Sequence, residues 1–278
     1  EALPNFARVD VEGKPSTVSD FTVPTDGLES PWGMAQYNFV YDSERVPEPP
    51  RSMAGLLAWI EAHPGRFTYP APPDHIGSTF LKHVLIESLD DPAVLQQPAT
   101  DETFAKLTEA MWPMLEAVQP ALWRSGQAYP ASGPAMHQLL ADGEIDVSMA
   151  FNPVEASRAI ADGILPDTVR TFILEDGTIA NSHFVAIPYN AAHKAGALVV
   201  ANYLLSPEAQ AEKLKPEVWG DGTVLDLRAL SAEQRALFEA IPRGIATLPP
   251  EALEPRLLEP HPSWMTRIEE VWQERFAG

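Results

Sequence analysis

The sequence predicts an α/β protein whose strands pair mainly in parallel. Short runs rich in β-branched and aromatic residues alternate along the chain with longer segments of helical periodicity, which is the pattern of βα units. The 28 prolines fall mainly between these segments and end them. With 45% hydrophobic residues among 278, the chain can bury a large core, in one bilobal domain or in two domains.

The first quarter of the chain is expected to pass from loops into a strand and a helix. Residues 1–33 contain four prolines and indicate extended, loop-rich structure. Residues 35–41 are aromatic and β-branched, and predict a strand. After a proline-rich connector, Ser52 is placed to cap a helix that ends near residues 63–65. Residues 66–69 predict a second, shorter strand.

The middle of the chain predicts further helices around one strand. Residues 76–85 and 101–118 hold apolar side chains at helical spacing, and residues 136–140 form a shorter helix. Residues 145–151 alternate as a strand does and lead into a helix that begins at Asn152.

The last third continues this alternation. Residues 183–188 predict a strand, followed by a helix over 191–205 and a polar helix over 208–213. Beyond them, turns alternate with helices around residue 238 and over 264–276.

Composition excludes several classes of partner and site. The net charge of −20 argues against nucleic acid and anionic membranes, which are held by clustered Lys and Arg. It is consistent with a highly soluble protein or with a cationic ligand, and a global charge does not distinguish these. The absence of cysteine removes thiolate metal sites and Cys nucleophiles, and favours an exported protein. The longest apolar stretch, 195–205, falls short of the roughly 20 residues that span a bilayer.

The chain starts with Glu1, without an initiating Met or a secretory leader. We therefore interpret it as a mature or truncated chain.

Several segments resemble one superfamily, the periplasmic solute-binding proteins. Residues 41–56 are similar to the region after their first crossing between lobes, 139–146 to a helix–Gly-Glu–strand element, and 195–210 to the helix that packs after the return crossing. Longer words narrow the resemblance to YnjB-like ABC transporter substrate-binding proteins. These words are ESPWGMAQ (29–36), PGRFTYP (64–70), FNP (151–153), NSHFVAIP (181–188), WGD (219–221) and EPHPSW (259–264).

The resemblance implies a bilobal, type II periplasmic binding protein-like fold. It places residues 1–36 and 184–215 in lobe I, residues 42–182 and 222–278 in lobe II, and crossings near 37–41, 183–188 and 216–221. Such proteins begin with βα units that build lobe I and one wall of the cleft. Nothing in this sequence resembles those units, so lobe I is expected to lack them.

The function implied by the resemblance is that of the solute-binding component of a bacterial ABC importer. Such a protein is a periplasmic monomer without enzymatic activity or cofactor, which delivers a small solute to a permease in the inner membrane. The ligand stays open between an organic cation, a zwitterion and a small anion.

Ligand contacts are expected at strand ends, helix starts and crossings, where two lobes close on a solute. Trp32 precedes the first crossing and could stack on a cation, with Glu29 nearby as a counter-charge. Tyr37 lies on the crossing itself. For Trp32 a core or lobe-interface role, and for Glu29 a surface or capping role, stay open.

A different chemistry is suggested by Ser78 and Thr79, which open a helix after a proline turn. Free N–H groups and the helix dipole there suit an anion, and ordinary capping is the alternative.

Four more candidates flank the crossings. Asn152 follows a strand, Asn181 and His183 flank the return crossing, and Trp219 lies in the third connection. Capping or a structural turn would explain these positions equally.

Two other functions stay open in the sequence. A secreted hydrolase could use Glu29, Asp221 and His183, although no catalytic motif supports it. A non-binding interaction module is the other alternative.

Overall fold

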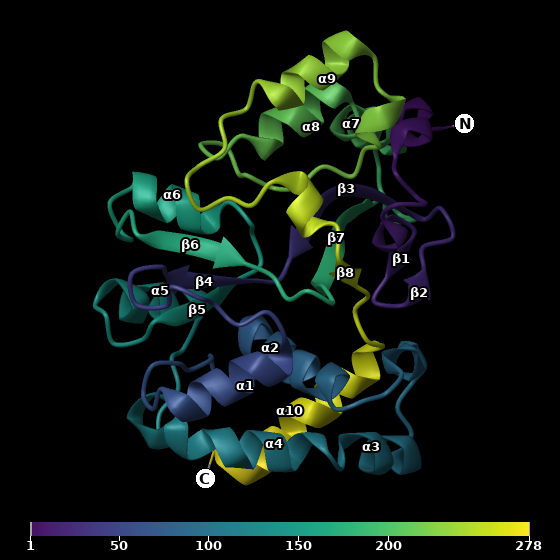
Figure 1. The fold of residues 1–278 in the computed structure, drawn as a ribbon. Coiled ribbons are helices and arrows are strands. Elements are labelled where there is room, and N and C mark those ends of the chain that lie inside the picture. The colour runs from purple at the N-terminus through teal and green to yellow at the C-terminus, as the bar shows by residue number, and fades with distance from the viewer. Residues whose placement is uncertain (1, 278) are drawn as a thin grey trace.

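The computed structural model describes residues 2–277. Its strands are β1 (Ser19–Asp20), β2 (Val23–Pro24), β3 (Glu29–Gln36), β4 (Asn38–Asp42), β5 (Val147–Ala150), β6 (Val169–Phe172), β7 (Thr178–Ala186) and β8 (Arg256–Leu257). Its α-helices are α1 (Met53–Ala62), α2 (His75–Glu87), α3 (Asp101–Thr108), α4 (Met111–Val118), α5 (Gly133–Ala141), α6 (Glu155–Ala161), α7 (Lys194–Leu204), α8 (Pro207–Leu214), α9 (Ala232–Glu239) and α10 (Pro262–Phe276). Figure 1 shows α7–α9 at one end of the molecule and α1–α4 with α10 at the other.

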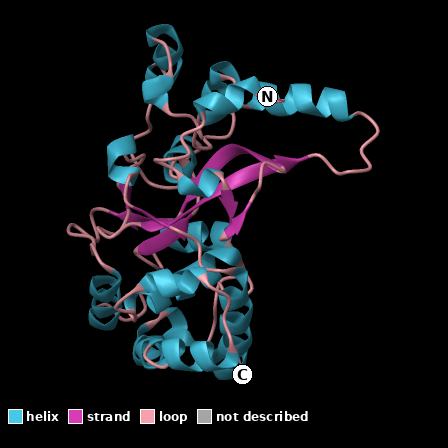
Figure 2. Ribbon diagram, turned by 90° about the vertical axis from the view of Figure 1, so that its right-hand side faces the viewer, coloured by secondary structure: helices cyan, strands magenta, loops and turns pink. Residues whose placement is uncertain are grey.

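Three small sheets connect the helical groups. The strand orders are β1-β2, β3-β7-β8 and β5-β4-β6. The strands lie between the two groups of helices, as the rotated view in Figure 2 also shows. The α/β class is therefore confirmed.

The expectation of mainly parallel pairing is wrong for the described residues. Strand β4 is antiparallel to both β5 and β6, and β3 is antiparallel to β7, whereas β7 and β8 are parallel. The reason is that the chain runs from β3 through Tyr37 directly into β4 and later returns through β6 into β7. The outgoing strands β3 and β4 and the returning strands β7 and β6 therefore run in opposite directions and pair antiparallel.

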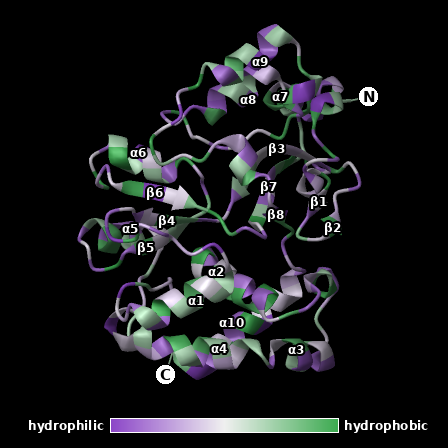
Figure 3. Cartoon of the chain, viewed as in Figure 1, coloured by the Kyte–Doolittle hydropathy of each residue, from purple (hydrophilic) through white to green (hydrophobic). Residues whose placement is uncertain are grey.

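Two separate hydrophobic clusters hold the fold together. We call them the large cluster, which includes Phe39, Phe80 and Trp272, and the small cluster, which includes Met34 and Phe238. The further buried members of the small cluster are Val9, Leu205, Ala211, Val224, Leu225 and Leu230. Along the helices at both ends of the molecule, hydrophobic and hydrophilic residues alternate (Figure 3), as expected for helices that bury one face.

The clusters show where the chain changes sides. Met34 lies in the small cluster and Tyr37 in the large one, so the first change falls at the end of β3. The segment 216–221 does not change sides, because α8 and Val224 on either side of it both belong to the small cluster. The later change falls between Phe238 and Ala246, which belongs to the large cluster.

The packing of the last part of the chain differs from the expected division. Residues 222–278 were assigned together to lobe II, but residues 224–238 pack in the small cluster. Only the part from Ala246 onward packs in the large one. Turn-forming residues at 216–221 indicate a change of direction, and do not indicate which core the following residues join.

Several element boundaries follow from local signals in the chain. Ser52 caps α1 by accepting a hydrogen bond from the Gly55 amide at 3.0 Å, as predicted. The predicted helix over 101–118 is divided into α3 and α4. Pro113, the third residue of α4, has no N–H to donate to Glu109, which ends the continuous hydrogen-bond ladder. The predicted strand at 66–69 is reduced to one bridge between Phe67 and Val147.

Candidate functional site

A compact group of side chains lies where β3, β7 and the connection after α8 meet. We call Trp32, His183, Lys213, Trp219 and Asp221 the crossing cluster. Strands β3 and β7 place Gly33 opposite His183, so the neighbouring Trp32 lies beside the return strand. Residues far apart in the sequence thus meet in one place, as the resemblance implied for Trp32, His183 and Trp219.

The buried carboxylate of Asp221 organises the charged half of the cluster. Its Oδ1 lies 3.1 Å from His183 Nε2 and its Oδ2 lies 3.0 Å from Lys213 Nζ. Lys213 Nζ also donates to the backbone oxygens of Asp221, at 2.9 Å, and Gly222. Burial lowers the pKa of Lys213, while Asp221 opposes this shift. Because all three ammonium donors are used, Lys213 has no hydrogen free for an anionic ligand.

Gly33 allows Asp221 to approach the strand this closely. A Cβ at position 33 would lie 1.8 Å from Asp221 Oδ2 and 3.0 Å from the His183 ring. Any side chain there would displace the carboxylate, so the glycine of the sequence word ESPWGMAQ has a direct structural role.

The aromatic half of the cluster faces outward. The ring centroids of Trp32 and Trp219 lie 5.0 Å apart, and His183 stacks on Trp219 at 5.6 Å with 16° between the planes. Trp219 is 39% exposed. Asn152 joins the group from the end of β5, because its Nδ2 donates to the Trp219 carbonyl at 3.1 Å. Four of the nine candidate residues, Trp32, Asn152, His183 and Trp219, are therefore brought together.

Three candidates lie in the core instead. Tyr37 is fully buried, and its hydroxyl lies 3.2 Å from the Ile76 carbonyl and 2.7 Å from Met149 Sδ. Ser78 and Thr79 are each 1% exposed. The helix does not start at Ser78 as expected, because α2 begins earlier, at His75, and Asp74 caps it by accepting from the Ile76 amide.

The hydroxyl of Ser78 is also occupied. It donates to the carboxylate of Glu269 on α10. A buried hydroxyl that already donates to a carboxylate is not available to an anionic solute.

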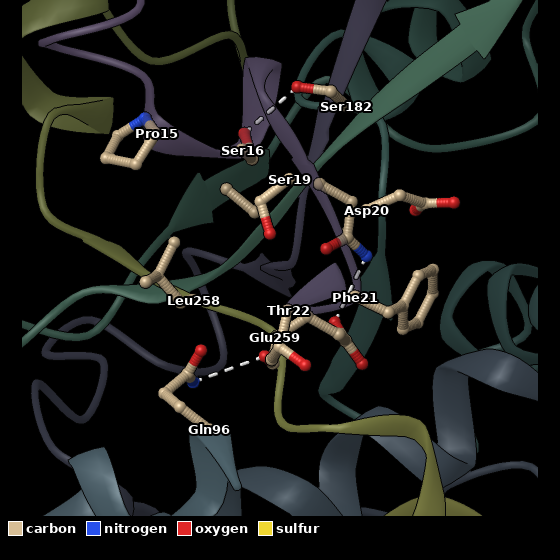
Figure 4. Close-up of a pocket in the computed structure, with 12 residues that line it drawn as sticks. Pro15, Ser16, Ser19, Asp20, Phe21, Thr22, Gln96, Ser182, Leu258 and Glu259 are labelled. Carbon is tan, nitrogen blue, oxygen red and sulfur yellow. Dashed lines mark hydrogen bonds between the residues drawn. The ribbon is translucent and has the colours of Figure 1, made fainter. Parts of the chain in front are cut away.

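Asn181 lies apart from the crossing cluster. Its Nδ2 donates to Glu259 Oε2 at 3.1 Å, and both residues line a small pocket. Figure 4 shows this pocket, with Ser16 pointing towards Ser182 and Gln96 towards Glu259. Its volume of about 50 Å³ accommodates a few water molecules and is too small for most organic solutes.

Glu29 lines an open groove of about 620 Å³, beside Val23 and Leu28, and does not join the crossing cluster. It is paired with Ala186, three residues along β7 from His183. At about 3.3 Å per strand residue the offset is roughly 10 Å, so Glu29, Asp221 and His183 do not assemble as a hydrolase would require.

The sequence analysis missed three residues at or near the cluster. His75 stacks on Phe151 at 5.2 Å, and Phe151 precedes Asn152. An aromatic residue at a strand end was a usable signal for Phe151. Nothing in the sequence indicated that Lys213, on a polar helix, is buried beside Asp221.

Among residues 2–277, no three His, Cys, Asp or Glu side chains are grouped closely enough to hold a metal ion. No helix within that range is both long and apolar enough to cross a membrane.

Comparison with known proteins identifies the family. Residues 3–238 match the bacterial extracellular solute-binding proteins. The chain is 42% identical over 277 residues to protein YnjB of Escherichia coli K12. This match covers 100% of the chain and 69% of YnjB.

Solved structures show the same fold. An ABC transporter protein from Clostridium perfringens has a TM-score of 0.67 at 18% identity, covering 99% of this chain and 74% of that one. The spermidine/putrescine substrate-binding protein PotD of Streptococcus pneumoniae has a TM-score of 0.65 at 13% identity, covering 98% and 75%. AfuA of Actinobacillus pleuropneumoniae, with fructose-6-phosphate bound, has a TM-score of 0.61 at 14% identity, covering 100% and 76%.

This family and fold are those of proteins that bind solutes and are not enzymes. The type II periplasmic binding protein fold expected from the sequence is confirmed. The chain belongs to the bacterial extracellular solute-binding proteins, and its function is the capture of a small solute for transport.

Proposed function

We propose that the large and small clusters are the cores of two lobes, and that a solute binds between them at the aromatic face of the crossing cluster. The protein works as a monomer in the periplasm and passes the solute to an ABC permease in the inner membrane. The observation that carries the site is the convergence of Trp32, His183 and Trp219 from three separate segments, with Asn152 reaching them from the other lobe.

The chemistry of this face favours an organic cation, or a zwitterion that presents its cationic end. Trp219 offers a partly exposed indole, on which an ammonium group is attracted by the ring electrons. The nearest positive charge, Lys213, is already committed to Asp221 and two carbonyls. The buried hydroxyl of Ser78, in the first turn of α2, donates to Glu269. A small anion therefore finds no available partner among these groups.

Helix α7 presents a second exposed apolar surface. Helix α7 exposes Val199, Val200 and Tyr203, at 70%, 56% and 60%. Exposed apolar side chains grouped on one helix are typical of a surface that another element covers.

Replacement of Trp219 tests the proposed site. The ligand panel is spermidine and putrescine as cations, γ-aminobutyrate as a zwitterion and fructose-6-phosphate as an anion, each followed by calorimetry. We expect a cation or zwitterion to bind, and Trp219→Ala to weaken its Kd about 2- to 30-fold, the equivalent of about 0.5–2 kcal/mol for a cation–π contact. Trp219→Phe should retain part of the affinity.

The matched control is Trp59→Ala, because Trp59 is also half-buried and stacks on a histidine, His63, but lies on α1. Equal losses in both variants would show that general destabilisation is responsible. Binding of fructose-6-phosphate alone would overturn the assignment of a cationic ligand.

A further inference from the structure

We call the lobes built on the small and large clusters the small lobe and the large lobe. The connection after α8 belongs to the small lobe and touches the large lobe beside the crossing cluster. Its residues 215–221 are fixed to the small lobe at both ends. The Gly220 amide donates to the carbonyls of Lys213 and Lys215 at 2.9 Å each, and Lys213 Nζ holds Asp221. The segment thus moves with α8.

The opposite surface is the start of α6 in the large lobe. Asn152 donates to the Trp219 carbonyl at 3.1 Å and accepts from the Val154 amide at 3.0 Å, so one side chain joins the two lobes. Val154 is 8% exposed, and its side chain packs against Gly220.

Gly220 permits this contact for two physical reasons. Its φ of +75° lies in the left-handed region, which other residues adopt at a cost. A Cβ at this position would also lie 1.9 Å from Val154 Cγ2, well inside van der Waals contact. A side chain at 220 therefore displaces Val154 on the facing surface.

We propose that the packing of Gly220 on Val154 is the contact that holds the lobes closed over the crossing cluster, and that Gly220 is a positioning residue for solute capture. The inference rests on the proposed function, because it assigns the contact to the lobe closure of a solute-binding protein. It adds the point that a backbone atom, not a charged pair, sets how closely the lobes approach.

The distance between the lobes provides the test. Because the chain has no cysteine, Ala58→Cys on α1 and Glu233→Cys on α9 would carry the only two spin labels, and both positions are exposed. Pulsed electron–electron double resonance on the ligand-free protein then reports the lobe separation. We expect Gly220→Ala to shift the distribution to longer distances, and to reduce the closed fraction and apparent affinity by the same factor, roughly tenfold.

Two companions make the result specific. Gly163 has a similar φ of +72°, and no atom lies within 4 Å of the place that a methyl group would take there. Gly163→Ala therefore adds only the conformational cost of a positive φ and no steric clash. It should leave the distance between the spin labels unchanged. Val154→Ala combined with Gly220→Ala should restore the shorter distance, because the clashing methyl is removed.

Where Gly220→Ala fails to fold, Val154→Phe separates the same surfaces from the other side and should give the same longer distance. Unchanged distances in the folded Gly220→Ala or Val154→Phe variant would overturn the inference. If the variants lengthen the distance but the wild-type protein binds nothing in the panel, the role of the Gly220–Val154 contact is supported and the proposed ligand class is rejected.

Discussion

Glu259→Ala is expected to destabilise the protein by about 3 kcal/mol, because it removes the carboxylate that contacts Lys82, a buried lysine whose pKa burial lowers to about 7 and which then keeps only the more distant charge of Glu269. Lys82 and Glu259 are 3% and 5% exposed, and Lys82 Nζ contacts Glu259 Oε1. The other carboxylate oxygen accepts from Asn181 on β7. The substitution therefore removes one ion pair and one hydrogen bond that join the large lobe to a crossing strand. Chemical denaturation at pH 7 measures the change.

The surface pair of Arg267 and Asp101 is the matched control. These side chains lie 2.8 Å apart, but Asp101 is 98% exposed, so Asp101→Ala should cost less than about 1 kcal/mol. Replacing both buried partners, by Lys82→Met with Glu259→Leu, should recover most of the lost stability, since no unpaired charge then remains. A Glu259→Ala variant no less stable than Asp101→Ala would contradict this account.

Acidification is expected to destabilise the protein through its buried histidines. His83 is 2% exposed, and burial lowers its pKa from 6.5 to about 4. Its Nε2 accepts from the Ile179 amide at 3.1 Å, and its Nδ1 lies 2.9 Å from the Thr79 carbonyl, so the folded protein holds a neutral ring. A protonated Nε2 could no longer accept this hydrogen bond on β7.

The direction of the pH effect follows from the two states. Between pH 6.5 and 4 the unfolded chain binds a proton on His83 that the folded protein does not. The contribution of His83 to the free energy of unfolding is fully present above pH 6.5. It falls by about 3 kcal/mol as the pH decreases towards 4. His137, whose pKa burial also lowers to about 4, acts in the same direction.

Comparison with His83→Gln isolates the contribution of His83. Gln retains an acceptor for Ile179 but does not titrate. The wild-type free energy of unfolding should fall by about 3 kcal/mol more than that of the variant between pH 7 and pH 4. Parallel pH profiles for the two proteins would show that His83 does not titrate as described.

The elements that depend on neighbouring residues could be predicted from the sequence. Ser52 caps α1 through a residue three positions away, and the run of aromatic and β-branched residues that predicted a strand over 35–41 overlaps β4. The convergence of Trp32, His183 and Trp219 was accessible because resemblance placed each on or beside a crossing.

The errors concern partners that are far away in the sequence. Ser78 gives its hydroxyl to a residue 191 positions later, and no local pattern distinguishes such a buried serine from an open helix start. Likewise, the segment 216–221 has the glycine and proline of a turn, but only the packing of Val224 and Phe238 shows that the chain stays with α8. Strand direction depends in the same way on which strands pair.

A structure determined with the tightest-binding solute of the panel tests the central claim most directly. We predict that its cationic group lies within about 6 Å of the Trp219 ring centroid, between the two lobes and within reach of Asn152. Solute found in the groove beside Leu28 and Glu29, with the faces of Trp32 and Trp219 unoccupied, would contradict it.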